Sequence, residues 1–236
     1  MKVTVFNGSP RGRTSNSHLI TKPLLEGARE AGAETEEVFL VEKNIEQCAG
    51  CFSCWGVTPG GCVHNDDMAP LIDLFIESDY VGMATPVYGM LMTAILKKFT
   101  ERLLPLNTPH IRRDQDGSFY HEGRVRRFPR MFMIANAGFP GEHNFELLRA
   151  YMALQDPVLE IYRNCGELLR NADKIASDEG RRRIADFYGA VRCAGGEMVE
   201  SGAVTAETLG RIHAELMRDD EYMAAVNESW DEGEMD

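Results

Sequence analysis

The sequence predicts an α/β fold in which a parallel sheet is covered by helices on both faces. Short apolar segments alternate with longer segments whose apolar residues recur every three or four positions, a pattern typical of strands joined by helical crossovers. Several of the short segments end in loops rich in Gly, Ser, Thr and Asn. The 236-residue chain is 44% apolar and 26% charged, which is enough apolar material for one sizeable core and excludes intrinsic disorder.

Five short segments are predicted to form strands, at residues 2–6, 34–40, 80–84, 130–135 and 158–162. The first is apolar and ends in the polar run that begins at Asn7, and the second alternates weakly between polar and apolar residues. Because helical patterns separate the strands, the sheet is expected to be parallel. Ligands of such sheets bind beyond the carboxyl ends of the strands, so the loops after residues 6, 84 and 135 are candidate binding loops.

Six segments are predicted to form helices, at residues 19–31, 67–75, 90–104, 145–154, 184–198 and 209–216. The pattern is strongest over 184–198, where apolar residues recur at spacings of 3, 4, 3 and 4. Pro23 falls inside the first pattern, so either that helix is kinked or a helix begins there after a Thr21 cap. We expect one domain over 1–204, with a compact cysteine segment at 48–62 and an insertion at 105–129. A C-terminal helix and an acidic tail would follow over 205–236.

The charge balance and the absence of long apolar segments limit the partners. There are 25 basic and 37 acidic residues, a net charge of −12, so the chain repels phosphate backbones and a nucleic-acid partner is not expected. The first apolar run turns polar at Asn7, so no secretory signal is expected. The longest uncharged stretch, residues 80–96, is too short to span a membrane and contains Gly and Pro. We therefore expect a cytoplasmic protein with no membrane partner.

The loop after the first strand is rich in side chains that suit a phosphate group. It contains Ser9, Arg11, Ser15, Asn16 and Ser17 just before a helix, where hydroxyl and backbone donors can bind a terminal phosphate and an arginine adds charge. The loop contains neither the dinucleotide-binding GxGxxG pattern nor the Walker pattern GxxxxGK[ST]. The alternative is an ordinary polar loop in which Ser15 or Asn16 caps the helix.

These residues also carry a resemblance to a known family. The run 8–11 (GSPR) followed by 15–17 (SNS) resembles the phosphate loop of flavodoxin-like, FMN-dependent NAD(P)H oxidoreductases, and 85–90 (TPVYGM) is similar to their second loop, which borders the isoalloxazine ring. The resemblance covers roughly the first 105 residues. It implies a flavodoxin-like, doubly wound parallel sheet of five strands with helices on both faces. It also implies FMN as cofactor, NAD(P)H as a co-substrate, and a homodimer or homotetramer.

The second and third loops have a physical rationale as flavin contacts. Pro86 fixes the chain, backbone groups of Val87 and Tyr88 can meet the hydrogen-bonding edge of the ring, and Tyr88 offers an aromatic face. Asn136 and Gly138 form the third loop, where glycine would let the backbone approach the ring. The alternative for the second loop is a strand-terminating turn with a packed tyrosine.

Four of the six cysteines are concentrated in one short segment. The spacing is Cys48-x2-Cys51-x2-Cys54-x7-Cys62, with several glycines that allow tight turns. Three thiols at successive x2 spacings suit an iron-sulfur site, and the spacing resembles that of the iron-sulfur flavoprotein branch of the family. We expect these four thiols to ligate a [4Fe–4S] cluster. The alternatives are reduced cysteines without a metal, and a four-cysteine zinc site.

No residue is predicted to be a catalytic base. The histidines lack partners at a useful sequence spacing, and His18, next to the phosphate loop, is equally explained by helix packing. Hydride transfer between a nicotinamide and a flavin requires alignment rather than proton abstraction. The insertion at 105–129 carries five arginines, which could meet an NADPH 2′-phosphate or an acidic redox partner. A solvated hairpin or a subunit-contact arm is the preferred interpretation.

Two functional hypotheses follow from these loops. The first is an FMN protein with a [4Fe–4S] cluster that passes electrons between a reduced donor, such as a ferredoxin-like protein, and an acceptor such as a small molecule. The second is an NAD(P)H-dependent reductase of FMN or quinones without a cluster. A zinc-stapled binding module is a third, weaker hypothesis. The sequence does not identify the electron donor or the electron acceptor.

Overall fold

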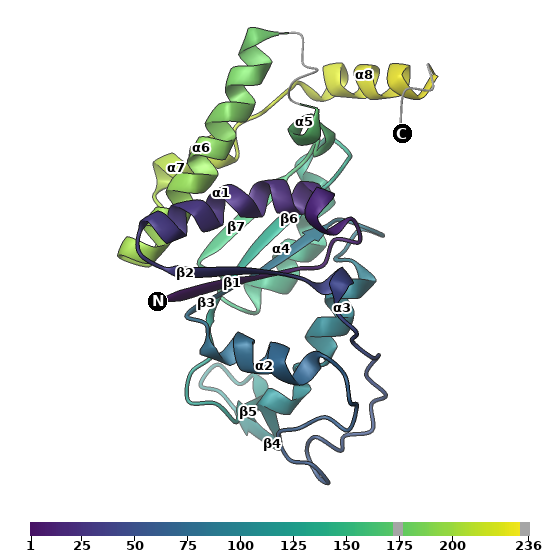
Figure 1. The fold of residues 1–236 in the computed structure, drawn as a ribbon, viewed down its shortest axis with the longest axis vertical. Helices are drawn as coiled ribbons and strands as arrows, with labels where there is room; N and C mark the ends of the chain where they lie inside the picture. The colour runs from purple at the N-terminus through teal and green to yellow at the C-terminus, as the bar shows by residue number, and fades with distance from the viewer. Residues whose placement is uncertain (172–176, 232–236) are drawn as a thin grey trace.

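Five parallel strands form the sheet at the centre of the molecule. The computed structural model describes residues 1–171 and 177–231. The strand order is β2-β1-β3-β6-β7, and every neighbouring pair is parallel (Figure 1). The strands are β1 (Lys2–Asn7), β2 (Glu34–Phe39), β3 (Tyr80–Pro86), β6 (Arg130–Asn136) and β7 (Leu159–Arg163). The order reverses direction at β1, which confirms the predicted doubly wound, flavodoxin-like sheet.

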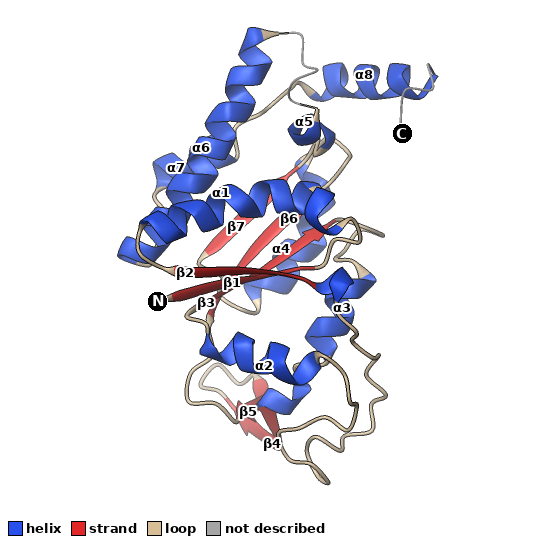
Figure 2. Cartoon of the chain, viewed as in Figure 1, coloured by secondary structure: helices blue, strands red, loops and turns tan. Residues whose placement is uncertain are grey.

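Helices cover both faces of this sheet, also as predicted (Figure 2). One face is covered by α1 (Asn16–Glu30), α6 (Asp178–Ser201) and α7 (Ala206–Ile212), the other by α2 (Met68–Glu77), α3 (Ala94–Glu101) and α4 (Glu146–Ala153). The remaining helices are the short α5 (Glu167–Arg170) and α8 (Asp219–Asp231), which lies beyond α5 at the top of the view. No helix among the described residues is both long and apolar enough to cross a membrane.

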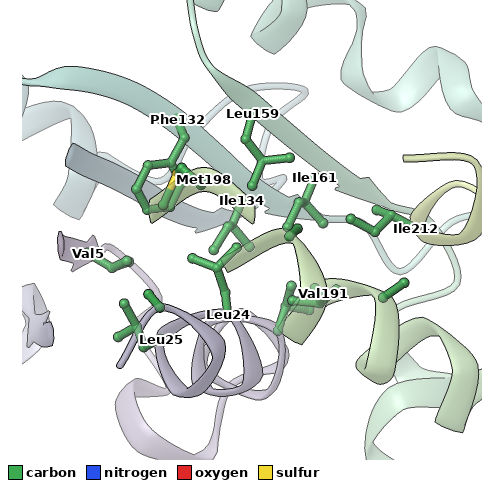
Figure 3. Close-up of a cluster of buried hydrophobic side chains, with 14 of the residues drawn as sticks. Val5, Leu24, Leu25, Phe132, Ile134, Leu159, Ile161, Val191, Met198 and Ile212 are labelled. Carbon is green, nitrogen blue, oxygen red and sulfur yellow. The ribbon is translucent and has the colours of Figure 1, made fainter. Parts of the chain in front are cut away.

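The core between the sheet and the α1/α6 layer is close-packed. Figure 3 shows Leu24 of α1 and Val191 of α6 beneath Ile134 of β6 and Ile161 of β7. The two helices cross with their backbones in near contact, because a Cβ atom built at Gly195 would lie 2.0 Å from the carbonyl oxygen of Leu24. Burial of this apolar surface is the main favourable contribution to folding on this side of the sheet.

The second core lies between the sheet and α2, α3 and α4. Phe6 of β1 stacks on Phe99 of α3, with ring centroids 4.4 Å apart, and lies 6.3 Å from the ring of Phe75 in α2. Met133 of β6 and Met152 of α4 are fully buried on the same side. Because α3 is anchored in this core at Phe99, its two ends hold fixed positions relative to the sheet.

Several predicted boundaries differ from the structure for local reasons. Pro23 lies inside a continuous α1, whose N-cap is Ser15 rather than Thr21. The third helix begins at Ala94 rather than near residue 90, since Gly89 and Met90 adopt positive φ angles of 57° and 67° in a turn that precedes it. The C-terminal helix predicted at 209–216 is α7, which ends at Ile212, and the second C-terminal helix, α8, was not predicted. Of the predicted tail at 231–236, residues 232–236 lie outside the described part of the chain.

The insertion at 105–129 forms the antiparallel hairpin β4 (Asn107–Arg113) and β5 (Phe119–Gly123), drawn below α2 in the view of Figure 1. Its side chains are largely exposed, and its arginines find partners nearby: Arg112 donates to Glu122 at 2.9 Å, and Arg124 donates to the carbonyl of Asn107 at 3.2 Å. The hairpin agrees with the preferred interpretation of this segment. The predicted division of the chain at 204/205 stays a prediction.

Candidate functional site

A pocket with an empty volume of about 460 Å³ lies at the carboxyl edge of the sheet. It is formed by the loops that follow β1, β3 and β6, with one residue from α5. Nine of the ten predicted cofactor residues line it, together with Glu167; the nine are Ser9, Arg11, Asn16, Ser17, Pro86, Val87, Tyr88, Asn136 and Gly138. The structure therefore brings the three candidate loops together at one place.

Ser15 is the predicted residue that does not line this pocket. Its hydroxyl donates to the carbonyl of Gly12 at 2.7 Å and accepts from the backbone N–H of His18 at 3.1 Å. Ser15 is therefore the N-cap of α1. Both hydrogen-bonding capacities of its hydroxyl are used within the chain, and its role toward a phosphate stays a prediction.

A buried polar network that the sequence did not predict supports the first loop. The Asn7 side chain accepts from the backbone N–H of Ser9 at 2.9 Å and donates to Glu37 of β2 at 2.8 Å. The other oxygen of Glu37 is 2.7 Å from Nδ1 of His18. Burial raises the pKa of Glu37, against the opposing effects of Asn7, His18 and Arg13. His18 thus supports the loop and does not line the pocket.

Asn136 joins the second and third loops to the first. Its side-chain amide nitrogen donates to the hydroxyl of Ser17 at 2.9 Å. Its backbone carbonyl accepts from the backbone N–H of Val87 at 2.7 Å. The next residue, Tyr88, exchanges backbone hydrogen bonds with Leu91 in a tight turn, and 52% of Tyr88 is exposed. The aromatic ring is thus available to a ligand at the rim of the pocket.

Thr93 fastens the start of α3 to the first loop. Its hydroxyl donates to the carbonyl of Gly8 at 2.7 Å and accepts from the backbone N–H of Leu96 at 3.2 Å, so it is also the N-cap of α3. Gly8 is required here because a Cβ atom would lie 2.5 Å from the Cβ atom of Leu96. The loop and the helix therefore share one rigid junction.

Glu167 is the acidic residue of the pocket, and no sequence pattern pointed to it. One of its oxygens accepts from the Asn16 side chain at 3.3 Å and lies 3.6 Å from the Arg11 guanidinium. Tyr222 of α8 donates to the carbonyl of Gly138 at 2.7 Å and so fixes the third loop. The ionisable residues in the described lining are Arg11, Tyr88 and Glu167.

The four clustered thiols line a second pocket at the C-terminal end of α3. Cys48, Cys51, Cys54 and Cys62 are all free. Burial raises the pKa of Cys54, and the nearby Cys62, Cys51 and Cys48 raise it further. Among the described residues, no three His, Cys, Asp or Glu side chains are placed to hold a single metal ion.

Two buried nitrogen atoms at this second pocket lack a hydrogen-bond partner. They are Nε of Arg102 and Nε2 of His64, and both residues line the pocket with the cysteines. Buried polar atoms without a partner are uncommon in folded proteins, so an unfilled donor at a pocket indicates where an acceptor would fit. The four thiols are ligands suited to iron, and the Nε–H of Arg102 is a donor suited to sulfur.

The comparisons with known proteins agree with the geometry of the first pocket. Residues 1–118, half of the chain, match the NADPH-dependent FMN reductase family. The chain belongs to that family. The predicted identity as a member of an FMN-dependent oxidoreductase family is thereby confirmed, and family membership supports FMN as the cofactor.

The curated relatives of this family member include several iron-sulfur flavoproteins. One from Archaeoglobus fulgidus is 40% identical over 105 residues, which cover 44% of this chain and 46% of the relative. Another, from Methanocaldococcus jannaschii, is 30% identical over 156 residues, 66% of this chain and 77% of the relative. The matched part of this chain thus spans about half the length of the first relative.

Solved structures with the same fold are more distant in sequence. An FMN-dependent NADH-azoreductase from Bacillus anthracis matches with a TM-score of 0.58 at 14% identity, over 84% of this chain and 99% of the other. A protein from Klebsiella pneumoniae that is described as a quinone reductase matches with a TM-score of 0.62 at 15% identity, over 85% of each chain. At these identities the likeness establishes the fold of this FMN reductase family member and nothing further.

Proposed function

We propose that the protein is an FMN-dependent oxidoreductase that passes electrons between a reduced donor and an acceptor through FMN and a [4Fe–4S] cluster. The observation that carries this proposal is the relation of the two pockets to one helix. The N-cap of helix α3, Thr93, is bonded to Gly8 of the first loop, and the helix ends at Glu101, which lines the cysteine pocket together with Arg102. An eight-residue helix is about 12 Å long, so one short rigid element connects the two sites.

The residues of the first pocket suit FMN. Ser9, Asn16 and Ser17 offer hydroxyl and amide groups for a terminal phosphate at the start of α1, and Arg11 adds positive charge. When bound, the flavin supplies hydride and single-electron transfer chemistry. The chain's contribution is to hold the ring against Pro86 to Tyr88 and to leave room beside Gly138, where a Cβ atom would meet no other atom within 4 Å.

The residues of the second pocket suit an iron-sulfur cluster. Thiolates are the ligands that such clusters prefer, and N–H groups directed at the cluster's sulfur atoms are part of how proteins tune it. Here four thiols and the unpartnered Nε of Arg102 border one pocket. The names of the curated relatives support the same assignment. A bound cluster would supply one-electron transfer.

The alternative is an NAD(P)H-dependent reductase of FMN or quinones in which the cysteines hold no cluster. The family description, NADPH-dependent FMN reductase, favours this activity and does not require a cluster. A ferredoxin-like protein or NAD(P)H as the donor, a small molecule as the acceptor, and a homodimer or homotetramer as the assembly are parts of the proposal that rest on the resemblance alone.

The proposal is tested by metal and flavin analysis of protein purified without oxygen. We expect iron, acid-labile sulfide and FMN in the wild type, and a Cys51→Ser variant that keeps FMN but loses the iron absorption, because a hydroxyl is a poor ligand for cluster iron. Stopped-flow reduction of the flavin by a one-electron donor should then slow sharply in the variant. Direct reduction by NAD(P)H should persist.

Cys193→Ser provides the matched control. Cys193 is also free and exposed, but it lies on α6 and not at the pocket, so the variant should keep its iron. FMN without iron in the wild type would favour the cluster-free reductase, and zinc in place of iron would favour a structural metal site. Equal iron in Cys51→Ser and Cys193→Ser would refute the assignment of the thiols.

A further inference from the structure

The side chain of Arg102, immediately after α3, is a buried charged group at the cysteine pocket. One terminal nitrogen, Nη1, donates to Asp66 at 2.6 Å and to the backbone carbonyl of Glu46 at 2.7 Å. The other, Nη2, donates to the second oxygen of Asp66 at 3.1 Å. The side chains of Arg102 and Asp66 are each only 1% exposed. This is a bidentate pair with the geometry that a guanidinium and a carboxylate prefer.

The pair closes the loop that carries the thiols. Glu46 lies two residues before the first cysteine, and Asp66 lies four residues after the last. Asp66 also accepts from the backbone N–H of Glu46 at 2.8 Å, and Asp67 accepts from the backbone N–H of Asn44 at 2.8 Å. The two ends of the loop are therefore bonded to each other and to Arg102. The intervening residues 47–65 form turns and no helix or strand.

The third nitrogen of the Arg102 guanidinium, Nε, is not bonded to Asp66. This Nε atom is buried and has no nitrogen or oxygen partner, while Arg102 lines the pocket with the four thiols. Burial lowers the pKa of Arg102, but Asp66 and the nearby Cys62 outweigh it and raise that pKa. Asp66 is not part of that lining, and the other charged residue in it, Glu101, is exposed and paired with Lys97 at 2.6 Å, so the buried charge that borders the pocket is the positive charge of Arg102. A buried N–H without an acceptor is rare, because it loses its hydrogen bond to water and gains none in exchange.

We infer that Arg102 is a positioning residue for the iron-sulfur site: it fixes the ends of the cysteine loop and offers its Nε–H and its positive charge to the thiolates and sulfur of the cluster. The inference rests on the proposed function. A cluster held by four thiolates becomes more negative on reduction, so a buried cation beside it favours the reduced form and raises the reduction potential. Closing the loop also slows the loss of iron, because the ligands stay together when one iron–sulfur bond opens.

The test uses a pair of substitutions that keeps the site neutral. Arg102→Gln alone would leave the Asp66 carboxylate buried without a partner, so we combine it with Asp66→Asn. The matched control is Arg112→Gln with Glu122→Gln, which removes an exposed ion pair from the hairpin. Arg102→Lys is a third variant that keeps the charge but cannot form the bidentate contact. The measurements are FMN content, the midpoint potential of the cluster in a dye-mediated titration, and the rate of iron loss to a chelator.

We expect the Asp66→Asn, Arg102→Gln variant to keep FMN, to have a more negative midpoint potential than the control, and to lose iron several-fold faster. Arg102→Lys should keep a midpoint potential close to that of the wild type but lose iron faster. Potentials and rates equal to those of the control would overturn the role of Arg102. If the double variant takes up no iron, the Arg102→Lys variant provides the test. A rate of iron loss from that variant equal to the rate of the wild type would overturn the role of Arg102. Wild-type protein without iron would refute the proposed function, and this inference with it.

Discussion

At residue 138, the wall of the first pocket is a backbone segment without a side chain. Gly138 has no atom within 4 Å of the place where a Cβ would lie, so a larger side chain would enter the pocket without displacing the core. We expect Gly138→Leu to fold like the wild type and to lose most of its FMN. The measurement is the ratio of flavin to protein after gel filtration, together with the thermal unfolding temperature.

Gly210→Leu is the control for this substitution. Gly210 lies in α7 and likewise has open space around its Cβ position, but it is not part of the pocket. The control should retain FMN. Stoichiometric FMN in Gly138→Leu would mean that the third loop does not border the flavin.

Neighbouring polar residues also differ in whether they line the pocket or stabilise the chain around it. Ser9 and Asn16 line the pocket, whereas Ser15 and His18 use their polar atoms to hold the chain itself. All four lie within ten residues and all are polar, so composition alone could not separate them. The direction of each side chain relative to α1 makes the difference.

At the scale of helices and strands, the N-cap of α3 links stability to binding. Replacing an N-cap threonine by alanine costs about 1 kcal/mol of stability, since the first turn loses a hydrogen-bond acceptor. Thr93→Ala should lower the free energy of unfolding by about that amount. It should also weaken FMN binding, because the same hydroxyl holds the carbonyl of Gly8. Urea unfolding and a flavin titration measure the two effects.

Thr205 at the start of α7 offers the comparison. It caps its helix by accepting from the backbone N–H of Thr208 at 3.3 Å, and it is not in contact with the flavin loops. Thr205→Ala should therefore cost a similar amount of stability without changing the affinity for FMN. Equal losses of affinity in the two variants would show that the Thr93–Gly8 bond does not position the loop.

At the scale of the whole molecule, the buried Arg102–Asp66 pair makes the free energy of unfolding depend on pH. Burial raises the pKa of Asp66, but the hydrogen bonds from Arg102 and from the backbone of Glu46 and Met68 outweigh it and lower the pKa from 3.8 to about 2. A carboxyl whose pKa falls on folding stabilises the fold above its unfolded pKa. This contribution disappears as the pH falls from about 4 toward 2.

We therefore expect the stability difference between the parent protein and its Asp66→Asn variant to shrink by about 2 kcal/mol as the pH falls through this range. Both proteins should carry Cys51→Ser so that iron binding does not contribute. The measurement is urea unfolding at a series of pH values from 6 downward. A difference that stays constant with pH would show that the Asp66 carboxylate has no special stability in the fold.

The sequence by itself determined the sheet, the three loops and the cysteine segment. Each of these is recognised from a local pattern: apolar runs separated by helical patterns indicate parallel strands, and residues such as Ser9, Val87 and Asn136 lie at or just after the end of a strand. Their convergence is a consequence of parallel strands ending at one edge. The same locality explains why the start of α3 was predicted too early, since the positive φ angle of Met90 leaves no trace in an apolar pattern.

Only the tertiary structure decided which distant side chains complete the two sites. Glu37 reaches Asn7 across 30 residues, Arg102 reaches Asp66 across 36, and Glu167 reaches Asn16 across 151. A single charged residue has no periodicity or motif, so its partner is unknown until the strand order and helix packing bring the two segments together. The sequence thus specified which loops meet, and the packing of β2, α3 and α5 against them specified the charges that surround each pocket.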